Sequence, residues 1–194
     1  MSSNTTNKTL IGVLIAIGAL IVIAVIMAVS SYNGLVTART DAESAFAKVD
    51  TQLQRRSDLI PNLMETVKGA TKNEQAIVQQ VTDARAKLAG AGSVNEKIDA
   101  NNELSGALSR LLMVVENYPD IKSNQNFLSL QDELAGTENR ITVARNDYND
   151  AVRAYDRKLR SFPSNIFAGI FGFERMNYFE AQPSADTPPQ VSFD

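Results

Sequence analysis

The sequence predicts an all-α protein: a single N-terminal transmembrane helix followed by an antiparallel up-and-down bundle of three to four long helices. Three observations predict this fold. Residues 10–29 are a run of apolar residues without one charge. Over residues 30–161, where we expect the bundle, apolar residues recur at alternating steps of three and four, the period of packed helices. No segment alternates with a period of two, so we expect no sheet.

The composition excludes several classes of function. Apolar residues make up 44% of the 194 residues and charged residues 21%, which is typical of a folded domain. The net charge of -3, without a cluster of basic residues, argues against nucleic acid as a partner. The chain has no cysteine and no histidine, so it lacks thiols, the commonest general base and the commonest metal ligand. We therefore predict no enzymatic activity, no catalytic residues, no metal and no cofactor.

The apolar run has the length of a membrane span. A helix over residues 10–29 rises about 30 Å, which matches the hydrocarbon thickness of a bilayer. A cleaved signal peptide has a shorter apolar core, of about 7–15 residues. We therefore expect an uncleaved anchor, preceded by a polar N-terminal tail over residues 1–9, with the lipid bilayer as the first partner.

The orientation of this span is weakly specified. Lys8 precedes it and Arg39 and Lys48 follow it, so the basic residues are nearly balanced. The balance leans slightly towards a cytoplasmic C-terminal domain. Gly12 and Ala16 form a pair of small residues four apart, which suits packing against a second transmembrane helix.

The first long helix of the bundle is expected over residues 30–89. Pro61 interrupts it, since proline lacks the N–H of a helical hydrogen bond and clashes with the preceding turn. Either the helix kinks at Pro61 and continues, or Asp58 caps a new helix whose first turn holds the proline. We favour the kinked helix, because the apolar positions keep their phase: Tyr32, Leu35, Ala42, Phe46, Val49, Leu53, Ile60, Leu63, Val67 and Ala70, then Ile77, Val81, Ala84 and Leu88.

Two further helices follow. The glycines of Gly90-Ala91-Gly92 end the first helix, and Ser93 and Glu96 have the spacing of a capping box for a helix over residues 93–117. A break at Tyr118-Pro119-Asp120 separates it from a third helix over residues 124–161. Short connections between long amphipathic helices predict antiparallel neighbours.

The C-terminal part has a different composition. Residues 162–181 hold five of the eight phenylalanines and form an amphipathic segment. Such a segment either covers the end of the bundle core or lies in the membrane surface. We favour the bundle, because residues 164–172 lack the basic residues that interfacial helices carry. Residues 182–194 are rich in proline with little to bury, so we expect a disordered tail.

Four charged residues stand at or beside core-facing positions: Arg39, Arg56, Glu138 and Arg145. One interpretation is buried ion pairs that determine the register of the helices. The other is a polar cleft that binds an anionic or peptide partner. We favour register, since bundle interiors commonly use polar positions for this purpose.

The order of several short motifs resembles the LemA family of bacterial membrane proteins. They are Tyr32-Asn33-Gly34-Leu35-Val36, the stretch from Gln54 to Leu63, Glu116-Asn117-Tyr118-Pro119-Asp120, Thr137-Glu138-Asn139-Arg140-Ile141, Ala144-Arg145-Asn146-Asp147-Tyr148-Asn149 and Phe162-Pro163-Ser164-Asn165. The resemblance implies a helical bundle on an N-terminal anchor, with no established enzymatic activity and no catalytic residues to transfer. It also implies a bacterial cytoplasmic or inner membrane as the location. Some relatives are linked to organelle-like membrane structures in magnetic bacteria, and others are encoded beside membrane proteases.

These observations converge on a membrane-anchored helical scaffold or accessory protein without catalysis. It would act through protein–protein contacts or lateral self-association, as a homo-oligomer or with membrane or membrane-associated proteins. The alternative is a sensor or accessory subunit of a membrane protease, a transporter or an envelope-stress system.

Overall fold

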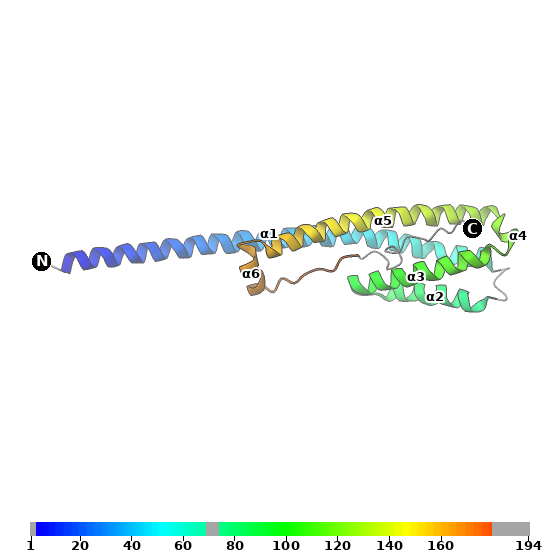
Figure 1. Cartoon of the computed structure of the whole chain (residues 1–194), viewed down its shortest axis with the longest axis horizontal. Helices are drawn as coiled ribbons and strands as arrows, with labels where there is room; N and C mark the ends of the chain where they lie inside the picture. Colours follow the sequence, from blue (N-terminus) through cyan, green and yellow to red (C-terminus); the bar gives the residue numbers. More distant parts are fainter. Residues whose placement is uncertain (1–2, 69–73, 180–194) are drawn as a thin grey trace, which may run out of the picture. The chain divides into compact units, whose positions relative to one another are not determined.

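The computed structural model describes residues 3–68 and 74–179, and the surroundings of side chains from Ile11 onwards (Figure 1). Every regular element in these residues is a helix, which confirms the all-α prediction. The helices are α1 (Ser3–Val67), α2 (Gln75–Gly90), α3 (Val94–Val115), α4 (Pro119–Lys122), α5 (Gln125–Arg160) and α6 (Ser164–Ile170).

Helix α1 contains the predicted membrane span. Among the described residues it is the one helix long and apolar enough to cross a bilayer, and the protein buries none of its most apolar stretch. The helix begins at Ser3, so residues 3–9 of the predicted polar tail are helical. Residues 3–9 contain neither proline nor glycine, and extending an existing helix by one residue is far easier than starting a new one.

Helix α1 continues through Pro61 and ends at Val67, while α2 begins at Gln75. The passage through Pro61 agrees with the continuous helix that we favoured; a kink there stays a prediction. The single helix over residues 30–89 is instead two helices. Gly69 supplies a reason in the sequence, because glycine inside a helix costs about 1 kcal/mol relative to alanine.

A side chain replaces the hydrogen bond that Pro61 removes. In an α-helix the N–H of residue 61 would donate to the carbonyl of Ser57, and proline has no N–H. The Nε of Arg85, on α2, donates to this carbonyl at 3.0 Å. Ser57 is buried, so its carbonyl would otherwise lack a partner away from water. The proline is thus tolerated because a neighbouring helix satisfies the freed group.

The chain divides into two compact units, of which one comprises Ser44–Asp150 and the described residues 177–179. In this unit α2 and α3 pack against each other, joined by the short loop after Gly90. The core is apolar, as the stripes predict: Val49, Leu53, Ile60, Leu63 and Val67 of α1, Val81, Ala84 and Leu88 of α2, Leu104, Leu108, Leu111 and Val115 of α3, and Phe127 and Ile141 of α5. Ala70 lies outside the described residues.

The other unit comprises Met1–Glu43 and Ala151–Met176, which include the first part of α1, the end of α5 and all of α6. Its small core is built from Leu35, Ala38, Tyr155 and Ala168, with Leu159, Phe173 and Met176 packed against it. Ala168 comes from α6, so one face of the Phe-rich segment packs on protein in this unit. The choice between bundle and membrane surface for the rest of the segment stays a prediction. The predicted tail over residues 182–194 lies outside the described residues.

The capping box predicted at the start of α3 is confirmed. The Ser93 hydroxyl accepts a hydrogen bond from the Glu96 N–H at 3.2 Å, and the Glu96 carboxylate accepts from the Ser93 N–H at 3.1 Å. The carboxylate also accepts from the Gly92 N–H at 2.8 Å. These backbone donors, Gly92 first and then Ser93, lower the pKa of Glu96 because they favour its charged form.

The contact between Arg85 and Ser57 predicts a coupling with Pro61. Arg85→Met should lower the free energy of unfolding by about 1–3 kcal/mol, since it leaves a buried carbonyl unpaired. In a Pro61→Ala background the same change should cost less, because the new backbone N–H satisfies that carbonyl. Urea unfolding of the full chain in detergent, followed by circular dichroism, measures both effects.

The matched control for Arg85→Met, with and without Pro61→Ala, is Arg110→Met. The Nε of Arg110 also donates to a helical carbonyl, that of Gly106 at 3.2 Å, but there the helix is uninterrupted. The control should therefore change stability little in either background. An equal cost for Arg85→Met with and without the proline would show that the two residues act independently.

The capping box predicts an acid-sensitive helix start. The folded pKa of Glu96 lies below its unfolded value, so its contribution to stability is present above about pH 4.5 and is lost as the pH falls through the folded pKa. Glu96→Gln should flatten the dependence of stability on pH in this range. Ser93→Ala should cost about 1 kcal/mol at neutral pH. Thermal unfolding between acid and neutral pH tests both, with exposed Glu103 as the site of a control Glu→Gln change.

Candidate functional site

One arginine is buried inside the helical bundle. Arg56 of α1 has only 6% of its surface exposed. Its Nη1 lies 2.9 Å from the Oε2 of Glu138, on α5. The two atoms form an ion pair but not an aligned hydrogen bond, because Oε2 has no hydrogen-bond partner by geometry among the described residues. A buried positive charge needs a negative charge close to it, so the ion pair between Arg56 and Glu138 holds α1 against α5.

A third helix completes the surroundings of Arg56. The same Nη1 donates to the side-chain oxygen of Asn101 at 3.2 Å and to the Ser105 hydroxyl at 2.9 Å. Both acceptors lie on α3, one turn apart, so they face the same direction. A single guanidinium therefore joins α1, α3 and α5, and the three helices cannot slide along one another without breaking these contacts.

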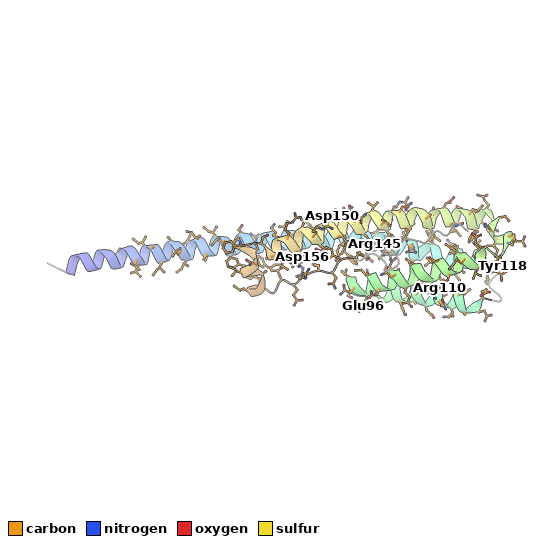
Figure 2. All side chains as sticks on the ribbon, in the orientation of Figure 1. Glu96, Arg110, Tyr118, Arg145, Asp150 and Asp156 are labelled. Carbon is orange, nitrogen blue, oxygen red and sulfur yellow. The ribbon has the colours of Figure 1, made fainter. Side chains whose placement is uncertain are left out.

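Arg145 is the second cation of this cluster, on α5 (Figure 2). Its Nη2 donates to Asn102 of α3 at 3.5 Å, and its guanidinium lies 4.9 Å from the ring centroid of Phe179. A cation over an aromatic face is attracted by the charge distribution of the ring. Arg145 thus links α3, α5 and the C-terminal segment within one unit.

The electrostatics of the cluster follow from burial. Burial lowers the pKa of Arg56, the carboxylate of Glu138 opposes this, and the second guanidinium of Arg145 adds to the lowering. Burial also lowers the pKa of Arg145, and Glu138 again opposes it. Arginine nevertheless stays charged at any physiological pH. Glu138 thus stabilises both cations and is the acidic member of the cluster.

Arg39, which the sequence places at or beside a core-facing position, is not among the residues that contact Arg56. It lies in the unit that contains the span and forms an ion pair with Glu43, one turn further along α1, at 2.9 Å. Both side chains are more than half exposed, so the pair contributes little to stability. Between the buried residues Leu35 and Ala42 of α1, the position that faces the core is Ala38, and Arg39 is the exposed residue next to it.

A groove opens beside the ion pair. Its volume is about 400 Å³, and it is lined by Arg56, Ser105, Leu108, Ser109, Leu112, Gln131, Leu134, Ala135 and Glu138. The lining combines one ion pair with apolar and hydroxyl side chains. This groove is the place where the second interpretation, a partner bound between helices, would apply.

Sequence reasoning missed the neutral members of the cluster. Asn101 is fully buried and stands three residues before Leu104, on the inward face of α3. It interrupts the apolar stripe of that helix, and this interruption was the available signal. Ser105 and Asn102 flank this stripe, where polar residues are ordinary, so the sequence carried no signal for them.

The C-terminal segment is held by a second set of polar contacts. The Tyr148 hydroxyl donates to the carbonyl of Asn177 at 2.8 Å. The side chain of Asn149 donates to the Phe179 carbonyl at 3.0 Å and accepts from the Phe179 N–H at 2.9 Å. The Phe179 ring packs in an aromatic cluster with Phe46 and Tyr148, at centroid distances of 6.3 and 5.6 Å. Burial raises the pKa of Tyr148, so the hydroxyl stays a donor.

The comparison with known proteins settles the family. The model of the LemA family matches residues 45–193. The chain belongs to the LemA family. The matched range includes the buried cluster, the motif from Ala144 to Asn149 and the aromatic contacts of Phe179. The resemblance drawn from the motifs is thereby confirmed.

Curated relatives come from magnetic bacteria and from a mycoplasma. Magnetosome proteins MamQ 1 and MamQ 2 of Paramagnetospirillum magneticum are each 30% identical to this chain over 203 residues, covering 88% of this chain and 75% of theirs. MamQ of Magnetospirillum gryphiswaldense is 27% identical, covering 82% and 70%. Protein LemA of Metamycoplasma hominis is 20% identical, covering 77% and 68%. This LemA-family chain is accordingly a membrane-associated helical protein.

The buried pair predicts a difference between two glutamates of α5. Glu138→Ala leaves the Arg56 charge buried with neutral partners alone, and should lower the free energy of unfolding by about 1–3 kcal/mol. The control is Glu133→Ala, whose partner Arg55 is 3.5 Å away with both side chains about half exposed. It should cost less than about 1 kcal/mol. Equal, small losses in urea unfolding would contradict the role in register.

Proposed function

We propose that this LemA-family protein is a membrane-anchored helical scaffold that acts without catalysis, through protein–protein contacts or lateral self-association. The observation that carries the proposal is the continuity of α1. The helix that contains the candidate span, from Ile11 on, is the same helix that provides the first wall of the bundle down to Val67. No linker of another kind therefore separates the candidate span from the first helix of the bundle.

The charged cluster supports a structural task for the bundle interior. Arg56 is satisfied by Glu138, Asn101 and Ser105, which are all on neighbouring helices. Buried polar contacts of this kind specify one arrangement of helices over its alternatives. A scaffold needs a single, well-defined surface. By favouring one arrangement of the helices, the cluster favours one such surface. The roles of Arg39, Arg56, Glu138 and Arg145 in register, with partner binding as the alternative, remain part of this proposal.

The surface of the bundle unit offers places for partners. Met113 on α3 and Val143 on α5 are large apolar side chains with 64% and 61% of their surface exposed. Val143 lies at a shallow depression of about 330 Å³ lined also by Lys48, Gln52, Asn139, Arg140, Ala144 and Asp147. Single exposed apolar side chains are common on protein surfaces, so Met113 and Val143 are candidate contact positions that crosslinking can test.

The relatives support a role in membrane organisation. Three of them are named magnetosome proteins. The names of these relatives support the proposal that this chain also takes part in a membrane assembly. They do not indicate in which compartment of the cell. The bacterial cytoplasmic or inner membrane is the location that we propose, with the bundle on the cytoplasmic side.

An accessory subunit of a membrane protease, transporter or envelope-stress system is the second candidate. The contact of Arg85 with the Ser57 carbonyl favours it, because it joins α2 to the interrupted turn of α1. A partner that moved α2 would weaken or break the hydrogen bond from Arg85 to the Ser57 carbonyl, and so destabilise the turn of α1 that contains Pro61. In that case Pro61→Ala should alter the cellular response without unfolding the protein.

Single cysteines test the scaffold, since the chain contains none of its own. The variants Val143→Cys and Met113→Cys should give reproducible crosslinked products with a short bifunctional thiol reagent in native membranes washed with alkaline carbonate. Asn117→Cys, at an exposed polar position, is the control and should give less product. Mass spectrometry of each product distinguishes a second copy of the chain from another membrane protein.

Two results would contradict the proposal. Release of the chain by the carbonate wash would exclude an integral anchor. Only monomers at Val143 and Met113, with no reproducible partner, would exclude a scaffold that acts through these two positions.

A further inference from the structure

Among the described residues, helix α6 has one largely exposed face, in the unit that contains the candidate span. Its buried residues, Ser164 and Ala168, face protein. The large apolar side chains beside and within it are exposed: Phe162 by 77%, Ile166 by 54%, Ile170 by 71% and Phe171 by 43%. Residues 161–173, which we call the α6 segment, contain no charged residue. The segment therefore presents an apolar surface that water solvates poorly.

The position of the α6 segment along α1 is given by two ring contacts. Tyr32 packs edge-on against Phe171 and Phe173, with centroid distances of 5.1 and 5.7 Å. Tyr32 stands three residues after the apolar run, hence about 5 Å along the helix axis. The layer of headgroups on each side of the hydrocarbon is about 5–8 Å thick. When residues 10–29 span the bilayer, the α6 segment thus lies at the level of the headgroups, beside α1 (Figure 1).

Basic side chains lie at the same level. The last turn of α5 carries Arg157, Lys158 and Arg160, and all three are exposed. Lys158 crosses α1 at Gly34: a Cβ at this glycine would come within 2.9 Å of the lysine Cε. The ammonium group is therefore held about two residues beyond Tyr32 along α1. Glycine at position 34 provides the space for this close approach.

These basic residues supply what the α6 segment itself lacks. The absence of Lys and Arg in residues 164–172 argued from the sequence against an interfacial helix. In the folded unit the basic residues come from α5 instead, and α6 contributes the apolar face. Apolar side chains beside basic ones are the combination that binds the boundary between headgroups and acyl chains. Tyrosine at this depth, as Tyr32 provides, is also typical of membrane interfaces.

We infer that the α6 segment, through Phe162, Ile166, Ile170 and Phe171, docks onto the surface of the bilayer that α1 enters, with Arg157 and Lys158 contacting the phosphates of anionic lipids. The inference rests on the proposed membrane anchor. It adds a second, lipid-specific attachment point. The anchor and the α6 segment together would restrain the rotation and tilt of α1 at the membrane surface, because two attachment points fix an orientation that one does not.

The docking is tested with the full chain in lipid vesicles and an environment-sensitive fluorophore on single cysteines. Ile166→Cys and Ile170→Cys report on the α6 segment. Ala154→Cys, an exposed position on α5 in the same unit, is the matched control. Leu20→Cys, within the span, reports on the anchor. The vesicles contain phosphatidylcholine and phosphatidylglycerol, with a nitroxide quencher near the headgroup end of the acyl chain in one set and at its terminal end in another.

The inference expects quenching at Ile166 and Ile170 by the shallow nitroxide, quenching at Leu20 by the deep one, and little quenching at Ala154. Quenching at Leu20 with no more at Ile166 and Ile170 than at Ala154 would overturn the docking and leave the anchor intact. Blue-shifted emission at Ile170 without quenching would also overturn it, since a second copy of the chain would then cover α6. No quenching at Leu20 would remove both the anchor and the docking that rests on it.

The lipid headgroup is tested with Arg157→Glu and Lys158→Glu, in the Ile170→Cys background. Each change should shift the ratio of docked to undocked segment by about fivefold or more in vesicles with phosphatidylglycerol, and little in pure phosphatidylcholine. Circular dichroism checks that the helices remain. Equal quenching in both lipids, or no effect of either substitution, would overturn the contact with anionic headgroups.

Discussion

The arrangement of the bundle depends on the burial of one positive charge. Arg56 lies in the middle of an apolar face, where an unpaired guanidinium would cost several kcal/mol of stability. Its partners come from α3 and α5, so the charge is tolerated only when these helices meet α1 at one height. Apolar contacts alone would permit a helix to slip by one turn and still bury its stripe. Such a slip would leave Arg56 buried without its partners and would therefore destabilise the bundle. The burial of the apolar core offsets the cost of burying this charge.

A similar principle explains how α1 passes Pro61. The proline leaves the carbonyl of Ser57 without its helical donor, and Arg85 of α2 replaces it. The same logic applies at Asn149, which pairs with both backbone groups of Phe179. In each case a backbone group that the local structure cannot satisfy is paired by a side chain from another segment. These contacts determine where α2 and the C-terminal segment lie, whereas the apolar residues determine only that they pack.

The unit that contains the span follows a different rule. Its core is small, and large apolar side chains of α6 remain outside it. A water-soluble domain of this size would be expected to bury them or to replace them by polar residues. Their position beside Tyr32 and near the basic end of α5 is understandable when the surrounding medium is the headgroup layer of a bilayer. Membrane contact would then provide the burial that the protein itself does not.

The sequence by itself determined the elements whose cause is local or periodic. The all-α fold, the span, the capping box of α3, the long helix ending at Arg160 and most core residues follow from spacing and capping chemistry within a few residues. The burial of Arg56 was also foreseeable, since it occupies an apolar step of the repeat. Tertiary structure alone decided which groups pair with it, because Asn101 and Ser105 are 45 and 49 residues away in the chain. It likewise left Arg39 outside the set of residues that contact Arg56 and placed basic residues of α5 beside the uncharged α6 segment, since each depends on neighbours that no local pattern records.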